Sequence, residues 1–185
     1  NPVECLTMIE LKQSWPMPYK NLPIVIFGAG SIVKDAHLPA YKNSGFEVVG
    51  IYDPDLGKAE ELAAKYDIKT FTTAQEAADQ KNVIFDLATP PAAHPELLKI
   101  LPPHSGALIQ KPMGSNLIEA TKILSICRER TLKAAVNFQL RFSPMMLALT
   151  DAIDKGMLGQ VVDFDAWLAL DTPWELWKFL EKLPR

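Results

Sequence analysis

The stretch Ile24-Val25-Ile26-Phe27-Gly28-Ala29-Gly30-Ser31-Ile32 decides the fold of this chain. Its apolar start is typical of a strand buried on both faces of a parallel sheet. The Gly-Ala-Gly turn then opens a helix: one glycine permits the tight turn, and the next lets the backbone approach a pyrophosphate. Free N–H groups at the helix N-terminus favour an anion there. The candidate dinucleotide-binding residues of this turn are Gly28, Gly30, Ser31 and Ile32.

Asp53 strengthens the dinucleotide interpretation of the turn. It follows the second apolar run, residues 46–52, and lies 23 residues after Gly30. An acid roughly 20 residues beyond the turn is expected to accept hydrogen bonds from the ribose hydroxyls of the cofactor. A carboxylate here also repels the additional phosphate of NADP, so the sequence favours NAD over NADP. In the alternative interpretation, Asp53-Pro54 is only a turn that starts a helix, and the Gly-x-Gly spacing is accidental.

Apolar runs alternate with segments of helical period up to residue 136. This alternation indicates a parallel sheet covered by helices, here a Rossmann-type, doubly wound α/β fold. We expect an N-terminal extension over residues 1–22, a dinucleotide-binding domain over 23–138 and the start of a second domain over 139–185. The runs predicted as strands are residues 24–27, 46–52, 83–87, 107–109 and 134–136.

The pattern changes after residue 138. Residues 142–155 have helical spacing and precede Gly156, a residue type that commonly ends helices. Residues 161–170 alternate apolar and mixed positions, which predicts a strand in a mainly antiparallel sheet of an α+β domain. The residues after Asn137 are too few for a closed sheet. We therefore expect either that the chain is part of a longer protein or that it binds a dinucleotide without completing a reaction.

Local signals support the helices of the first domain. Thr73 with Glu76 fits a capping box, in which side chains at the start of a helix bond to its free N–H groups. In the helix after residue 116, Leu117, Ala120, Leu124 and Cys127 recur at helical spacing. This spacing predicts that they form the buried face of the helix and that Cys127 is a structural thiol.

Several candidate residues follow the later strands. Dinucleotide folds bind their ligand beyond the carboxyl ends of the strands, and those ends meet at one edge of a parallel sheet. The residues that follow the strands are therefore candidates for binding cofactor or substrate. They are Ala88, Thr89, Pro90 and His94 after residues 83–87, Gln110 and Lys111 after 107–109, and Asn137 and Arg141 after 134–136.

These residues, in this order, resemble the cofactor-binding half of the glucose-fructose oxidoreductase and inositol dehydrogenase family, also called Gfo/Idh/MocA. The pieces that carry the resemblance are Gly28-Ala29-Gly30-Ser31-Ile32, Tyr52-Asp53, Thr89-Pro90 with His94, and Lys111-Pro112 with Gly114. The resemblance implies a Rossmann fold and an NAD(P)-dependent dehydrogenase that moves a hydride between the cofactor and a secondary hydroxyl of a sugar or polyol. It also implies homo-oligomers formed through a second domain.

Lys111 is the candidate catalytic residue. In the family, the matching lysine lies beside the nicotinamide, so by resemblance Lys111 would bond the reacting hydroxyl and help to move its proton. As a hydride leaves its carbon, the alcohol must lose a proton, and a partly desolvated lysine near the positively charged nicotinamide has a lowered pKa. A lysine at a strand end is otherwise simply solvated. Gln110 replaces the usual glutamate of the family's Glu-Lys-Pro motif, so the carboxylate is lost.

The resemblance implies further roles at the same edge. Thr89 and Pro90 would line the path of the cofactor, with the backbone at Ala88 near the nicotinamide ribose. His94 is in phase with the leucines of its helix, which favours a satisfied, half-buried structural histidine over a catalytic one. Asn137 and Arg141 could reach substrate or cofactor, or Arg141 could hold two domains together. We interpret His37 and His104 as structural. In the family the second domain supplies a histidine near the substrate, and no histidine follows His104 here.

Composition excludes several classes of function. With 185 residues, a formal net charge of −3 and 48% hydrophobic residues, the chain has the profile of an ordinary soluble protein. No basic cluster favours nucleic acid, no apolar run is long enough for a membrane span, and residues 1–20 lack the pattern of a signal peptide. The scattered histidines predict no metal site. Cys5 and Cys127 give no support for a disulfide, so we expect a reducing, cytoplasmic location.

Two alternatives to an enzyme stay open from the sequence. The first is a regulator or sensor that binds a dinucleotide without turnover. The second is a module that binds a protein partner and keeps only a vestigial nucleotide site. The replacements that hint at the second alternative are Val33, which takes the place of the third glycine of the fingerprint, and Gln110.

Overall fold

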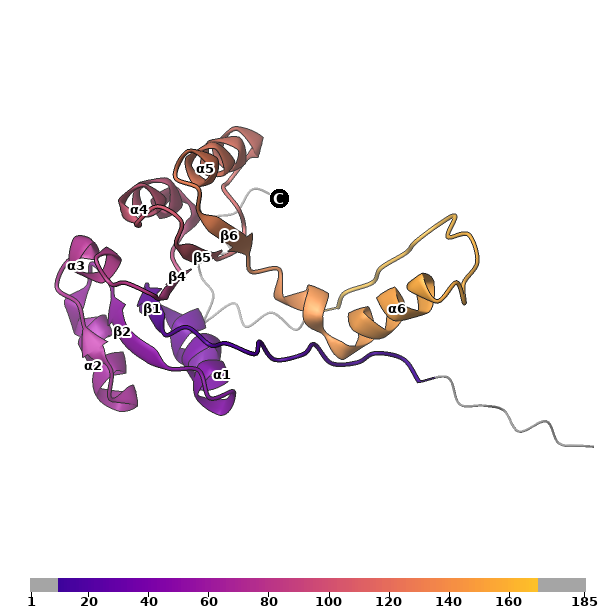
Figure 1. The fold of residues 1–185 in the computed structure, drawn as a ribbon, viewed down its shortest axis with the longest axis horizontal. Coiled ribbons are helices and arrows are strands. Elements are labelled where there is room, and N and C mark those ends of the chain that lie inside the picture. The colour runs from indigo at the N-terminus through magenta and orange to yellow at the C-terminus, as the bar shows by residue number, and fades with distance from the viewer. Residues whose placement is uncertain (1–9, 170–185) are drawn as a thin grey trace, which may run out of the picture. The chain divides into compact units, whose positions relative to one another are not determined.

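The computed structural model describes residues 10–169, which divide into two compact units. The larger unit, residues 15–143, holds a six-stranded, all-parallel sheet in the order β3-β2-β1-β4-β5-β6 (Figure 1). Strands β2 and β3 are added on one side of β1, and β4, β5 and β6 on the other. This is the strand order of the Rossmann fold, so the predicted fold class is confirmed. The strands are β1 (Ile24–Phe27), β2 (Val48–Tyr52), β3 (Lys69–Thr70), β4 (Ile84–Leu87), β5 (Gly106–Ile109) and β6 (Lys133–Val136).

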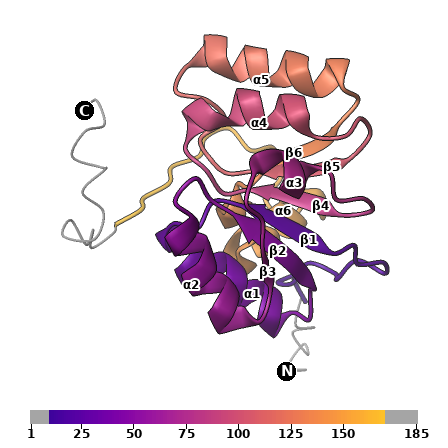
Figure 2. The same ribbon diagram turned by 90° about the vertical axis from the view of Figure 1, so that its left-hand side faces the viewer.

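Helices cover both faces of this sheet. Figure 2 shows α1 and α2 on one side and α4 and α5 on the other. The helical elements of this unit are the π-helical turn η1 (Val33–His37), α1 (Leu38–Asn43), α2 (Leu56–Tyr66), α3 (Ala74–Ala78), the 3-10 turn η2 (Pro91–Ala93), α4 (His94–Ile100), α5 (Leu117–Glu129) and the 3-10 turn η3 (Gln139–Phe142).

The two faces of the sheet carry separate apolar cores. Val33, Leu38 and Leu62 pack with Ile26 and Ile51 on the α1–α2 side. The opposite core joins the strands to α3, α4 and α5, and its largest members include Phe27, Phe85, Leu98 and Ile123. All four residues of β1 are buried, as its apolar sequence predicts. Full burial of each of these large apolar side chains contributes about 1.5–3 kcal/mol to the stability of the fold. Strand β1 therefore stabilises the middle of the sheet.

The start of α3 follows the predicted capping box. Thr73 Oγ1 accepts a hydrogen bond of 3.0 Å from the N–H of Glu76. The Glu76 carboxylate in turn accepts from the N–H of Thr72 at 2.9 Å and pairs with Lys69 at 2.7 Å. The bond from Lys69, followed by those from Thr72, lowers the pKa of Glu76 to about 2. The helix start and the strand before it are thus tied by local polar contacts.

The buried face of α5 differs from the predicted one. Ile123, Ile126 and Cys127 are buried, whereas Leu117 is 80% exposed and Leu124 41% exposed. The helix carries apolar residues on more than one stripe, so spacing alone does not say which stripe faces the sheet. The prediction for Cys127 is confirmed, since burial holds its thiol in the core and raises its pKa.

The smaller unit brings residues 10–14 together with 144–169. Its helix α6 (Pro144–Asp154) is followed by Gly156 with a φ of 69°, so the predicted helix and its glycine stop are confirmed. Residues 161–169 form no strand and are exposed, which corrects the strand expected there; residue 170 lies outside the described residues. A strand needs a neighbour for its backbone hydrogen bonds, and the described residues of this unit contain none.

Within residues 10–169, every helix is too short or too polar to cross a lipid bilayer.

Candidate functional site

The carboxyl ends of the strands meet along one edge of the sheet. The N–H of Gly28, after β1, donates to the carbonyl of Tyr52 at the end of β2 at 2.7 Å. The N–H of Gln110, after β5, donates to the carbonyl of Leu87 at the end of β4 at 3.1 Å. The candidate residues that follow these strands therefore lie side by side, where the strand order reverses. Open α/β sheets bind ligands at such a switch point.

The two glycines of the turn have different reasons to be glycine. Gly28 has a φ of 106°, and a Cβ there would overlap the carbonyl oxygen of Ala88, so packing alone requires glycine. A Cβ on Gly30 would meet no atom within 4 Å, so the fold does not require glycine at that position. The first N–H groups of the helix, at Ser31 and Ile32, have no intrahelical acceptor. Open backbone beside free N–H groups fits a pyrophosphate.

Asp53 lies beside this glycine turn. Its Oδ2 accepts a hydrogen bond of 2.7 Å from the N–H of Ala29, and its Oδ1 accepts one of 2.8 Å from the N–H of Asp55. An ionised carboxylate offers about four acceptor positions, so each oxygen keeps one for a further donor. Because the side chain is partly exposed, these free positions suit the hydroxyls of a ribose.

Ala88 and Thr89 connect the end of β4 to the glycine turn. The Ala88 carbonyl lies against Gly28, and Thr89 Cγ2 would lie 3.4 Å from a Cβ at that glycine. Within residues 10–169, the buried Thr89 Oγ1 has no hydrogen-bond partner. Pro90 is exposed and precedes η2. A buried hydroxyl without a partner at this edge of the sheet would suit a polar group of a cofactor.

His94 is more buried and less satisfied than the sequence predicts. It is wholly buried at the start of α4, and its Nε2 lies 3.0 Å from the carbonyl oxygen of Thr89. A carbonyl only accepts, so Nε2 carries the proton, and Nδ1 has no partner among the described residues. Burial lowers the pKa of His94 and keeps the ring neutral. The hydrogen bond from Nε2 holds the carbonyl group of Thr89 in place.

Gln110 and Lys111 occupy the end of β5 in opposite ways. Gln110 is buried, with 8% exposure, while Lys111 is exposed. The N–H of Lys111 donates to Gln110 Oε1 at 2.8 Å. The backbone of Lys111 is therefore held by a buried neighbour while its ammonium group stays free to reach a molecule at this edge of the sheet.

A buried group beside Gln110 was missed from the sequence. His37 and Asp86 lie together in the interior, 2.7 Å apart between Nδ1 and Oδ2, and His37 Nε2 lies 3.3 Å from Gln110 Nε2. The interpretation of His37 as structural did not foresee this contact. The available signal was Asp86 itself, because a charged residue inside an apolar strand is rarely buried without a partner.

The two remaining candidates lie at the far end of this edge. Asn137 follows β6, where its N–H donates to the carbonyl of Ile109 at 2.8 Å, so it neighbours the end of β5. Arg141 is exposed in η3. The structure thus brings Asn137 next to the strand ends and places Arg141 four residues further along the chain.

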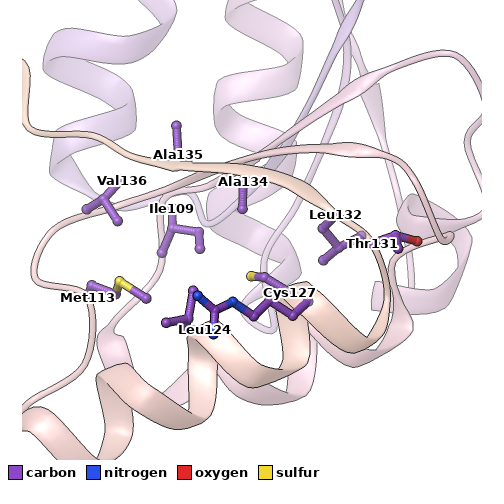
Figure 3. A pocket seen from close by; sticks show the side chains of 10 residues that line it. Ile109, Met113, Leu124, Cys127, Thr131, Leu132, Ala134, Ala135 and Val136 are labelled. Atoms are coloured by element: carbon purple, nitrogen blue, oxygen red, sulfur yellow. The ribbon is translucent and has the colours of Figure 1, made fainter.

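A cavity of about 540 Å³ lies elsewhere, between β6 and α5 (Figure 3). Apolar side chains surround it, among them Ile109, Met113, Leu124 and Val136. None of the candidate residues lines it. No three His, Cys, Asp or Glu side chains within residues 10–169 are grouped to hold a metal ion.

Comparison with known proteins gives a family match. Residues 22–138 match the family model described as "Oxidoreductase family, NAD-binding Rossmann fold". The matched segment includes the glycine turn, Asp53 and Lys111. It ends at residue 138, before η3 and α6 begin.

Individual relatives match about three quarters of the chain. It is 31% identical over 141 residues to trans-1,2-dihydrobenzene-1,2-diol dehydrogenase of Mus musculus, covering 74% of this chain and 42% of that protein. It is 30% identical over 143 residues to glucose-6-phosphate 3-dehydrogenase of Bacillus subtilis, covering 75% and 40%. The crystal structure of a putative myo-inositol dehydrogenase from Sinorhizobium meliloti superposes with a TM-score of 0.68 at 24% identity, covering 76% and 43%. The chain thus spans about two fifths of these relatives' lengths.

Proposed function

This chain belongs to the Gfo/Idh/MocA family of oxidoreductases, and from that premise we propose that it forms the cofactor-binding half of an NAD-dependent dehydrogenase. The proposed reaction moves a hydride between the nicotinamide and a secondary hydroxyl of a sugar, polyol or related carbohydrate. The observation that carries the proposal is the open backbone at Gly30 beside the Asp53 carboxylate, 2.7 Å from Ala29, at the switch point of the sheet.

The residues present fit the cofactor along its length. The turn from Gly28 to Ile32 would bind the pyrophosphate through backbone N–H groups, and Asp53 would accept from the adenosine ribose. The edge formed by Ala88, Thr89, Pro90 and Gln110 would hold the nicotinamide half, with His94 supporting the Thr89 carbonyl at 3.0 Å. The nicotinamide, when bound, supplies the position that accepts or returns the hydride.

We propose NAD rather than NADP as the cofactor. The carboxylate of Asp53 already accepts from two backbone N–H groups and stays available on its exposed side. A 2′-phosphate in the same place would bring a second negative charge against it.

Lys111 is the proposed proton-transfer residue. Its ammonium group is exposed at the strand end, while its backbone is held by Gln110 at 2.8 Å. In hydrogen-bond reach of the reacting hydroxyl, the neutral amine form of this lysine would take the hydroxyl proton as the hydride leaves, and the resulting ammonium would return it in the reverse direction. Asn137 and Arg141 are the proposed substrate contacts, where an amide and a guanidinium suit a hydroxyl-rich or anionic ligand.

The competing interpretation is a regulator or sensor that binds the dinucleotide without turnover. The names of the relatives favour the enzyme, since both curated relatives described above are dehydrogenases and one is named for a sugar phosphate. A module with a vestigial nucleotide site receives less support, because the fold does not require glycine at position 30 and the Asp53 carboxylate keeps acceptor positions free for a further donor. We also propose homo-oligomers and a cytoplasmic location, for which family membership and the buried thiol of Cys127 are the support.

A substrate screen tests the proposed activity. The chain is incubated with NAD and a panel of polyols, aldoses and sugar phosphates, and NADH formation is followed by absorbance. Lys111→Ala is expected to lower turnover at least about 100-fold while NADH still binds, because a positioned acid or base contributes roughly 10²–10⁴-fold. Lys122→Ala, an exposed lysine of α5, is the matched control. Full turnover by Lys111→Ala would assign the proton transfer elsewhere, and NADH binding without turnover on any substrate, in protein that includes the substrate-binding half, would favour the sensor.

A further inference from the structure

A buried polar cluster lies directly behind the Gln110–Lys111 segment. His37 from η1 and Gln110 after β5 are each 8% exposed, and Asp86 from β4 is 1% exposed. His37 Nδ1 lies 2.7 Å from Asp86 Oδ2, and His37 Nε2 lies 3.3 Å from Gln110 Nε2. The hydrogen bond of 2.8 Å from the Lys111 N–H to Gln110 Oε1 completes a chain of contacts from Asp86 to Lys111.

The backbone of Lys111 fixes the direction of every hydrogen bond in this chain. A backbone N–H only donates, so the atom of Gln110 that faces it must be the amide oxygen. The amide nitrogen of Gln110, which also only donates, then faces His37 Nε2. His37 must therefore accept at Nε2, which leaves its single proton on Nδ1. From there it donates to the carboxylate of Asp86.

The contact with Asp86 holds His37 in this form, with its proton on Nδ1. Its Oδ2 also accepts from the hydroxyl of Tyr41 at 2.9 Å. Burial first, and then the charge and hydrogen bond of Asp86, raise the pKa of Tyr41 well above its ordinary value, so this hydroxyl stays a donor. Asp86 Oδ1 has no partner within residues 10–169. A buried carboxylate with one oxygen unpaired costs stability, and what it provides in return is a fixed orientation of His37.

We propose that Asp86 and His37 are positioning residues for Lys111, and that Gln110 and the Nδ1-protonated form of His37 specify one another. The carboxylate that the family's Glu-Lys-Pro motif carries at position 110 is here supplied from β4 by Asp86. The cluster moves no proton to Lys111, because the Gln110 amide does not relay one; it fixes where the Lys111 backbone lies. This inference rests on the proposed function for its catalytic meaning, but its geometry is testable without it.

The charge arrangement makes a distinct prediction for each exchange of acid and amide. Gln110→Glu puts a second carboxylate against His37, whose Nε2 must then donate, so His37 becomes doubly protonated at neutral pH. Asp86→Asn keeps an oxygen for His37 Nδ1, so the wild-type form persists. In the double variant Asp86→Asn/Gln110→Glu the carboxylate and the amide change places, and the single proton of His37 moves to Nε2.

The experiment is nitrogen-15 NMR of the imidazole groups in the full chain, without cofactor, at neutral pH. His104→Asn and His94→Gln assign the signals of the other two histidines, which leaves the third signal to His37. The expected series for His37 is Nδ1–H in the wild type and in Asp86→Asn, both nitrogens protonated in Gln110→Glu, and Nε2–H in the double variant. A wild-type His37 that is protonated on Nε2, or on both nitrogens, overturns the proposal whether or not the variants fold.

Amide hydrogen exchange tests the link to Lys111. In His37→Phe the Gln110 amide loses its acceptor, and the Lys111 N–H is expected to exchange at least about tenfold faster, while the amide of Ile26 in β1 keeps its rate. Equal rates of Lys111 exchange in the two proteins, with β1 intact, overturn the positioning role. If all amides of His37→Phe exchange faster together, the variant is destabilised as a whole. The position of the proton on His37 in the wild type then tests the proposal.

Kinetic measurements distinguish a positioning role of His37 from a purely structural one. With a substrate in hand, His37→Phe is expected to lower kcat about tenfold while the Kd for NADH stays within about threefold, because Lys111 is displaced and the glycine turn is untouched. Failure of NADH to bind the wild type refutes the proposed function and leaves the NMR result standing. NADH binding together with the wrong proton position on His37 refutes only the positioning proposal.

Discussion

The two ends of the candidate site are built differently. At the ends of β1 and β2, the glycine turn and Asp53 are held by backbone contacts, such as the 2.7 Å bonds from Gly28 to Tyr52 and from Ala29 to Asp53. At the ends of β4 and β5, the buried side chain of Gln110 holds the backbone of Lys111 and in turn contacts His37, which is 73 residues away in the sequence. The first arrangement joins residues 24 apart in the sequence through backbone donors. The second joins side chains 49 and 73 residues apart.

The difference teaches where substitutions act. Changes in the glycine turn alter either the fold or ligand binding, depending on which glycine is replaced. Changes in the buried cluster are expected to alter the protonation of His37 and the position of Lys111. Three further substitutions separate these effects, beginning with the largest.

Gly28→Ala is expected to destabilise the fold by about 3 kcal/mol or more, because its Cβ would overlap the Ala88 carbonyl and its φ of 106° disfavours a side chain. Urea unfolding measures the loss. Gly30→Ala is the matched control, since its Cβ would meet no atom within 4 Å, and it should change stability by less than about 1 kcal/mol. Equal losses for the two variants would contradict the distinction between a packing glycine and a ligand-facing glycine.

Asp53→Ala is expected to weaken NADH binding about tenfold, because hydrogen bonds to a charged acceptor contribute roughly 1.5–3 kcal/mol. NADPH binding should weaken less or improve, since the repelling charge is removed, so the preference for NADH narrows. Fluorescence titration with both cofactors measures this. Asp55→Ala removes a neighbouring exposed carboxylate that pairs with Lys58 at 3.1 Å, and it should leave the preference unchanged. An unchanged preference in Asp53→Ala would remove Asp53 from the ribose site.

His94 gives the smallest of these effects, a pH dependence of stability. Burial lowers its pKa in the folded state, so below the unfolded value near 6.5 the unfolded chain binds the proton more readily. Its contribution to stability is therefore present above that pH and is lost as the pH falls through it. Urea midpoints at pH 7.5 and 5.5 should differ less in His94→Gln than in the wild type. The exposed His104→Asn should keep the wild-type difference; the same slope in His94→Gln would contradict the assignment.

The sequence predicted whatever is local. Apolar runs identified the five longer strands of the sheet, and the glycine turn with Asp53 lies at one end of it as the spacing predicts. The contacts of His37 were not predictable, because its partners lie 49 and 73 residues away and no local pattern joins them. The predicted buried face of α5 was wrong because the helix carries two apolar stripes, and either could face the sheet. The strand expected at 161–170 failed over its described residues because alternation alone supplies no neighbouring strand.

Titration of the chain with NADH, followed by nicotinamide fluorescence, tests whether the glycine turn binds the cofactor. Binding is expected to be saturable at one site per chain, and Gly30→Val is expected to weaken it at least about tenfold by filling the space beside the turn, without loss of folding. Wild-type protein that binds neither NADH nor NADPH while folded would contradict the account. Binding that Gly30→Val leaves unchanged would place the cofactor elsewhere.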